Sequence, residues 1–180
     1  KVNLSISDFY PNTKLAFTEY DFGGHDHISG GIAQADVFGK KKKNKVYLSN
    51  FFAEADGYIA SAFKIYRNYN GQNATFGNVG IPAIPNNQDF SVYAAVNGNN
   101  DNELHIIIIN KTDAAKTAPI EVKNGTVAYQ QAEVWGFDQN NSAITPRAAV
   151  NNISSNSFSY TVPAYSVLHF ILKENGVNVA

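Results

Sequence analysis

The feature that most constrains the fold is a change in hydrophobic periodicity near Asn86. Before that residue, stretches with apolar side chains at helical spacing alternate with short apolar runs, which predicts alternating helices and strands. After it, strand-length runs are separated by turns rich in Asn, Gly and Asp, such as 97–102 and the pair Asn124 and Gly125. We therefore expect two domains, residues 1–86 and residues 87–180, which meet near Pro82 and Pro85.

The first domain is predicted to be of the α/β class. A helix begins near the first residue and stops at Pro11, and a short apolar strand at 14–18 leads into the polar, glycine-containing loop 19–27. A helix then ends near Gly39, followed by lysines that we expect to be solvated, a strand at 46–49 and a helix around Phe63. This order is typical of a barrel-like or a doubly wound architecture.

The second domain is predicted to be all-β. No helical period is present after Asn86, and the apolar runs alternate with turns. The expected strands lie near residues 90–97, 103–110, 117–123, 128–138, 144–149, 157–162 and 164–173. Short strands of this kind, joined by tight turns, indicate an antiparallel β-sandwich.

Composition narrows the classes of partner. The formal net charge of -1 gives no basic surface for nucleic acid or for an anionic membrane, so a neutral polymer fits better. The chain has no cysteine, which excludes a thiol nucleophile and a thiolate metal site. Its longest apolar run, around 106–109, has the length of a strand, and we expect no contact with a membrane. Because the chain begins at Lys1 without a Met or a signal peptide, we expect it to be a fragment.

Segment 15–37 resembles the nucleophile region of glycoside hydrolase family 44. Segments 46–49, 58–63, 68–71, 91–98 and 104–111 follow the order of the same family, so the resemblance covers essentially the whole chain. It implies the C-terminal part of a TIM-like (β/α) barrel followed by a β-sandwich. It also implies a secreted, extracellular enzyme that cleaves β-1,4-glucans such as cellulose or xyloglucan internally, with retention of configuration. The implied partners are a β-glucan polysaccharide and an upstream barrel half, and no cofactor is expected.

The resemblance assigns Glu19 as the catalytic nucleophile. A carboxylate where a barrel strand ends faces the pocket formed by the βα loops. Retention requires a second carboxyl group about 5 to 5.5 Å away, and in this family that group lies on an earlier strand, upstream of Lys1. Glu54 follows the second predicted strand but matches no catalytic position of the family. It is interpreted as a polar contact to substrate or as a solvated acid.

The loop after Glu19 contains further candidates. Three roles are open for Tyr20 and Asp21: they orient Glu19, they form hydrogen bonds to sugar hydroxyls, or they pack the loop. His27 either donates a hydrogen bond to substrate or has a structural role, with Ser29 as the expected N-cap of the next helix. His25 and His27 are an i, i+2 pair without an assigned third ligand, so no metal is expected.

An aromatic platform is expected at the end of the second strand. Where relatives have a tryptophan, this chain has Phe51 and Phe52, and we assign sugar stacking to Phe52, with Phe51 as the alternative. The single tryptophan, Trp135, lies inside a predicted sandwich strand and is expected in the core.

A second function is open at this point, a non-catalytic carbohydrate-binding or structural β-sandwich with a barrel remnant. Such a binding module needs several exposed rings on one sheet. Phe90, Tyr93, Phe158 and Tyr160 instead alternate like ordinary strand residues, and the intact segment 19–24 favours the enzyme.

Overall fold

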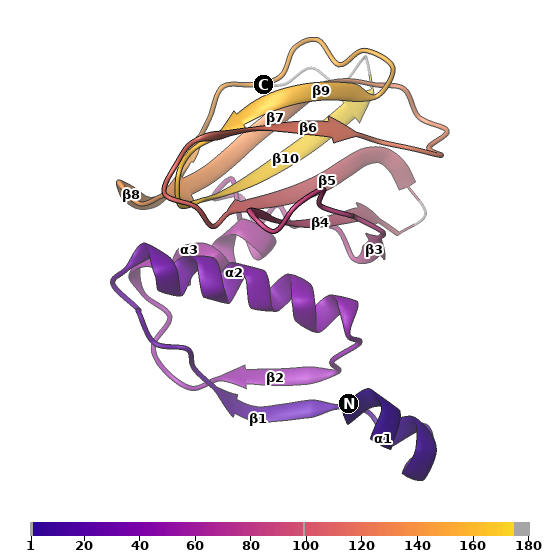
Figure 1. Ribbon diagram of the computed structural model, residues 1–180, viewed down its shortest axis with the longest axis vertical. Coiled ribbons are helices and arrows are strands. Elements are labelled where there is room, and N and C mark those ends of the chain that lie inside the picture. The colour runs from indigo at the N-terminus through magenta and orange to yellow at the C-terminus, as the bar shows by residue number, and fades with distance from the viewer. Residues whose placement is uncertain (1, 99, 175–180) are drawn as a thin grey trace.

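The structure consists of stacked layers of sheets and helices (Figure 1). The computed structural model describes residues 2–98 and 100–174. A two-stranded sheet covers one face of a six-stranded sheet, two helices cover the other face, and a two-stranded parallel sheet lies beyond the helices. Within the described residues, no helix is both long enough and apolar enough to cross a bilayer.

The six-stranded sheet is the centre of the molecule. Its order is β3 (Val79–Ile81), β4 (Phe90–Asn97), β5 (Asn100–Asn110), β10 (Ser166–Glu174), β7 (Tyr129–Asp138) and β8 (Asn141–Pro146). All neighbouring strands in it are antiparallel, and His169 of β10 lies between Ile107 of β5 and Trp135 of β7. The smaller sheet pairs β6 (Lys116–Glu121) with β9 (Ser157–Val162). The predicted β-sandwich is confirmed, and its strands lie within a few residues of the predicted ranges.

Two different hydrophobic cores form on the two faces of this sheet. Leu168 and Phe170 of β10 pack toward β6 and β9, whereas Val167 and Ile171 of the same strand pack toward the helices. Both faces of β5 and β10 are therefore buried. This explains why these strands read as continuous apolar runs rather than as alternating ones.

Strand β3 was not predicted from the sequence. It has only three residues, and its central Gly80 removes the alternating pattern by which a strand is recognised. Ile81 pairs with Ala94 of β4, so the six-stranded sheet begins before residue 86. The division of the chain at residue 86 stays an expectation, and the last six residues of the expected second domain, 175–180, lie outside the described part.

The N-terminal portion is a strand–helix–strand–helix unit preceded by a short helix. The elements are α1 (Val2–Phe9), β1 (Ala16–Tyr20), α2 (Ile28–Lys43), β2 (Leu48–Phe51) and α3 (Gly57–Arg67). Strands β1 and β2 are parallel, with α2 as the connection between them. They begin at residues 16 and 48 rather than at 14 and 46 as predicted, and Glu19 therefore lies inside β1 rather than in the following loop.

Helix α2 continues through the lysines that we expected to be solvated after its end. All four lysines of 40–43 lie in its last turn, where cations are favoured by the helix dipole. Lys40 forms an ion pair with Asp36 at 2.6 Å. Lys41 turns inward, and its Nζ atom is buried, so the expectation of a fully solvated run is wrong at this position.

Candidate active site

Glu19 lies at an irregular position of β1. Phe17 pairs with Ser49 and Tyr20 pairs with Phe51. Between these two pairs β1 therefore contains one residue more than β2. Such an extra residue is a bulge, which changes the direction of the side chains next to it. Glu19 is exposed, and within the described residues its carboxylate makes no hydrogen bond or ion pair. It is an open carboxylate near the carboxyl end of a parallel strand.

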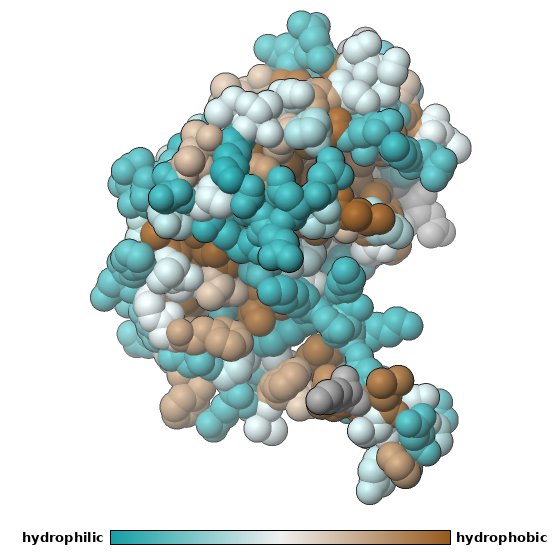
Figure 2. Space-filling view, viewed as in Figure 1, coloured by the Kyte–Doolittle hydropathy of each residue, from teal (hydrophilic) through white to brown (hydrophobic). Residues whose placement is uncertain are grey.

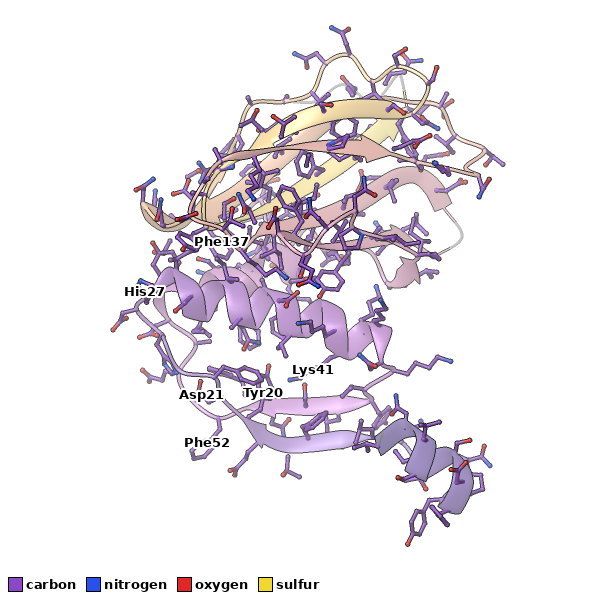
Figure 3. The ribbon with its side chains drawn as sticks, in the orientation of Figure 1. Tyr20, Asp21, His27, Lys41, Phe52 and Phe137 are labelled. Carbon is purple, nitrogen blue, oxygen red and sulfur yellow. The ribbon has the colours of Figure 1, made fainter. Side chains whose placement is uncertain are left out.

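Tyr20 is held in the layer between β1 and α2 (Figure 3). Its hydroxyl accepts a hydrogen bond from Nε2 of Gln34 at 2.8 Å, and its ring contacts Phe51 edge-on with the centroids 5.6 Å apart. Burial raises the pKa of the Tyr20 hydroxyl, and the bond from Gln34 partly opposes this. The side chain predicted to bind substrate thus has a partner on α2, and its role in binding sugar stays a prediction.

Asp21 and His25 form a pair within the loop that follows β1. Nε2 of His25 lies 3.0 Å from Oδ2 of Asp21, and Oδ1 of Asp21 accepts a hydrogen bond from the Gly23 N–H at 2.9 Å. The Gly23 N–H and then His25 lower the pKa of the Asp21 carboxyl. The two left-handed glycines of this loop, Gly23 and Gly24, let the chain turn back sharply toward the start of α2.

His27 is the N-cap of α2. Its Nδ1 accepts a hydrogen bond from the Ser29 N–H at 3.2 Å and lies 2.8 Å from the Ser29 hydroxyl. The prediction that Ser29 is the N-cap is wrong, because the helix begins at Ile28 and its N-cap lies two residues before Ser29. Accepting at Nδ1 leaves the proton on Nε2, so His27 has a structural role and still presents a free N–H donor.

Phe51 and Phe52 lie on opposite sides of the β1–β2 sheet. Phe51 packs against Tyr20 and Phe63, with ring centroids 5.6 and 5.7 Å apart. Phe52 is 67% exposed and points away from α2 (Figure 3). Its backbone N–H donates to the Tyr20 carbonyl at 3.0 Å, which places it beside the end of β1. Of the two rings, Phe52 is therefore the one open to a ligand.

Glu54 lies in the exposed loop between β2 and α3. Its carboxylate has no hydrogen bond or ion pair within the part of the chain that the structure describes. Because β1 and β2 are parallel, Glu19, Phe52 and Glu54 lie at or just beyond the same end of the two strands. His27 lies apart from them, at the N-terminus of α2 (Figure 3).

Sequence reasoning missed Lys41 as a neighbour of the site. Its Nζ lies 2.8 Å from the centroid of the Tyr20 ring and, within the described residues, has no hydrogen-bond partner. Burial lowers the pKa of Lys41 to about 8. Gln34 is the other α2 side chain that contacts Tyr20, and Lys41 lies seven residues, or two helical turns, after it. This spacing places both side chains on one face of α2 and is the sequence signal that could have predicted the position of Lys41.

Comparison with known proteins gives the class of the chain. No protein-family model matches it. Endoglucanase A from Paenibacillus lautus is 43% identical over 177 residues, which cover 96% of this chain and 25% of the relative. A Paenibacillus polymyxa xyloglucanase of glycoside hydrolase family 44, solved with xyloglucan, is 41% identical with a TM-score of 0.92 and is matched over 97% of this chain and 35% of that one. A family 44 endoglucanase from Clostridium acetobutylium is 40% identical with a TM-score of 0.93, and the coverage is again 97% and 35%.

The sequence and the fold match those of the corresponding parts of family 44 proteins. Over the residues that it spans, the chain belongs to glycoside hydrolase family 44, and the resemblance seen in the sequence is confirmed. The chain spans about a quarter of the length of the curated relative and about a third of the solved structures.

Proposed function

We propose that the chain is the C-terminal portion of a retaining endo-β-1,4-glucanase that acts on glucans of the cellulose or xyloglucan type. The observation that carries this proposal is the open Glu19 carboxylate near the carboxyl end of β1, in a chain that matches family 44 enzymes. The related protein solved with xyloglucan supports this substrate class.

In the proposed mechanism, Glu19 is the nucleophile. Its carboxylate attacks the anomeric carbon, and the bond to the leaving glycosidic oxygen breaks as that oxygen takes a proton from a second carboxyl group. Water then attacks the glycosyl-enzyme ester, gives its proton to the second group and releases Glu19. Phe52 supplies an apolar ring for a glucosyl face, and Tyr20 and Glu54 are the proposed polar contacts.

The second carboxyl group is proposed to lie upstream, in the rest of a TIM-like barrel of which residues 1–86 are the last part. The parallel unit from β1 to α3 supports this, because barrels are built of such repeats. The surface of this unit also supports the proposal, because Figure 2 shows apolar side chains exposed around α1 and the β1–β2 sheet. They include Phe9, Phe17 and Leu48, which are 73%, 42% and 50% exposed. An upstream barrel half is the partner that we propose for this face.

Residues 87–180 are proposed to be a structural sandwich rather than a separate carbohydrate-binding module. Among the described residues, every exposed large apolar side chain lies at or before Ile84, so the sandwich offers no platform of rings. An extracellular location is proposed because a polymeric glucan does not enter cells.

The test is Glu19→Gln in the full-length protein. An amide cannot attack the anomeric carbon, so kcat on soluble xyloglucan should fall by several orders of magnitude while the fold is kept. Glu54→Gln is the comparison variant, because it removes a carboxylate at the same end of the sheet that is proposed only to contact substrate. It should raise KM but leave kcat within about tenfold of the wild type. Activity of Glu19→Gln within tenfold of the wild type, or a fluoroglycoside label on another residue, would contradict the assignment.

A further inference from the structure

A hollow of about 640 Å³ lies on the sandwich side of α2, away from the Glu19 face. It is formed by the N-terminal half of α2, the first turn of α3 and the turns at the end of the sandwich. Its volume falls within the range of about 300–1,000 Å³ that is typical of small-molecule sites. Three apolar side chains of α2 line it, namely Ile28, Ile32 and Ala33.

Tyr165 lines the hollow from an unusual backbone conformation. Its φ of 39° lies in the left-handed region, which bulky residues rarely adopt outside constrained sites. The surrounding structure holds it there: its N–H donates to the Thr112 carbonyl at 2.9 Å, and the hydroxyl of the next residue, Ser166, donates to the Pro163 carbonyl at 2.7 Å. Within the described residues the Tyr165 hydroxyl makes no hydrogen bond. The conformation therefore fixes a ring whose polar end is open.

A second ring, Tyr58, lines the same hollow and is fixed by the sandwich. Its hydroxyl lies 3.1 and 3.0 Å from the carbonyl oxygens of Asp138 and Gln139, to which it donates. Two rigid tyrosine rings together with an apolar α2 surface offer flat contacts for a ligand with an apolar face.

Separate polar groups are available around these rings. Asp26, His27 and Gln139 line the hollow. In the described part of the chain the Asp26 carboxylate, His27 Nε2 and the Gln139 side-chain amide have no hydrogen-bond partner. They are an acceptor, a donor and a group that does both, which matches hydroxyl groups. Of the charged residues in the lining, Asp36 forms an ion pair with Lys40, and Lys111, whose Nζ donates a hydrogen bond to the Ser91 hydroxyl, carries the charge opposite to that of Asp26. The lining does not favour an ionic ligand.

We propose that this hollow is a second binding site for a neutral glucan chain. A glucosyl ring has an apolar face that fits the tyrosines and outward hydroxyl groups that fit the open polar groups. The site lies across α2 from Glu19, so it holds a part of the polymer that is not being cleaved. The ligand class rests on the proposed glucanase function, whereas the location rests on the hollow alone.

The test measures cellotetraose binding to the full-length protein by calorimetry and by NMR in a Glu19→Gln background. Two changes remove the site by different means: Tyr165→Gly removes the ring and suits the left-handed backbone, and Ala33→Trp fills the hollow. Each should weaken one of two binding events about tenfold and leave the other unchanged. Ala164→Gly, in the same turn but outside the lining, is the matched control and should bind normally.

Activity provides an independent readout in the protein with Glu19 intact. Both changes should raise KM on polymeric xyloglucan and leave kcat/KM on a short aryl cellobioside unchanged. A single binding event in the Glu19→Gln protein without further changes, or two unaltered events in both folded variants, overturns the second site. Hydrolysis that persists in Glu19→Gln overturns the proposed nucleophile instead, and NMR shifts confined to the hollow would still support this inference.

Discussion

Lys41 is a residue at which two physical effects oppose each other. Its ammonium group lies over the Tyr20 ring, which favours the cation, in a layer where water is largely excluded, which disfavours it. Burial lowers the pKa of the Lys41 ammonium group to about 8. The folded state therefore holds this charge at a cost.

We expect Lys41→Met to be more stable than the wild type at pH 7. Below about pH 8 lysine is protonated in both the folded and the unfolded chain, so the desolvation cost is fully present. Between about pH 8 and the ordinary lysine pKa of 10.5, Lys41 has lost its proton in the folded state but not in the unfolded chain. The wild type therefore gains stability as the pH rises through this range, and its difference in stability from Lys41→Met shrinks. Urea unfolding at pH 7 and pH 9.5 measures this, with the exposed Lys43→Met as control. A lower stability of Lys41→Met at both pH values would mean that the ring contact dominates.

The two phenylalanines at the end of β2 should respond in opposite ways to truncation. Phe51→Ala removes a half-buried ring from the cluster with Tyr20 and Phe63 and should cost about 1–3 kcal/mol of unfolding free energy. Phe52→Ala removes an exposed ring and should change stability by less than about 0.5 kcal/mol. In the full-length protein it should instead raise KM for xyloglucan, and Phe52→Trp should restore binding. An unchanged KM in Phe52→Ala would remove this ring from the proposed cleft.

Helix α2 packs against both the loop after β1 and the central sheet, and its glycines allow these close contacts. A Cβ atom on Gly30 would overlap the carbonyl of Gly24 in the loop after β1, and one on Gly39 would overlap the ring of Tyr93 on β4. At Gly31 the contacts are looser, with Tyr58 and Phe137 atoms at 3.0–3.1 Å. The helix thus fixes the loop that follows Glu19 by direct backbone contact.

We expect Gly30→Ala to destabilise the protein by about 1–3 kcal/mol, since the overlap with backbone outweighs the gain of about 1 kcal/mol in helix propensity. Gly31→Ala, whose contacts with Tyr58 and Phe137 atoms are tight at 3.0–3.1 Å but do not overlap, should lose less. Thermal unfolding of both variants gives the comparison, and equal stability of the two would show that the 23–24 turn moves freely.

At the scale of the whole molecule, a buried histidine pair lies between the central sheet and α3. Nδ1 of His105 lies 3.0 Å from Nε2 of His169, and Glu103 on the far side of His105 is 3.0 Å from its Nε2. Tyr69 contacts the His169 ring edge-on at 4.4 Å. Burial, and secondarily His105, hold the pKa of His169 well below its usual value.

This histidine should make the protein sensitive to acid. Because the folded-state pKa of His169 is depressed, the unfolded chain binds more protons below about pH 6.5, and stability falls as the pH drops through that value. His169→Gln should be less stable at pH 7 but should lose less stability between pH 7 and pH 5. Glu103, Glu133 and Lys173 also lie near the pair, so Glu133→Gln serves as the control. An equal loss in the wild type and in His169→Gln would place the acid sensitivity elsewhere.

The sequence predicted some of these features well and others not at all. The sandwich strands followed from apolar runs and turns, which are local signals. The assignment of β3 to the central sheet and the inward turn of Lys41 depend on partners more than ten residues away along the chain. The capping role of His27 is local, but it was missed because a hydroxyl at Ser29 is a commoner N-cap than an imidazole. At the candidate site, Glu19 was found through a family motif, whereas the bulge that sets its direction exists only in the pairing of β1 with β2.

The packing of the helices on the central sheet affects how the protein unfolds. Ile107, Val167 and Ile171 face α2 and α3, so the helices of the N-terminal portion complete the sandwich's own core. Cutting the chain at residue 86 would expose that face to water. The backbone amides of β5 and β10 should therefore exchange with deuterium only when the whole molecule opens, while those of α1, which has no buried residue, exchange early. The two portions, distinct in their sequence patterns, should therefore unfold as one cooperative unit.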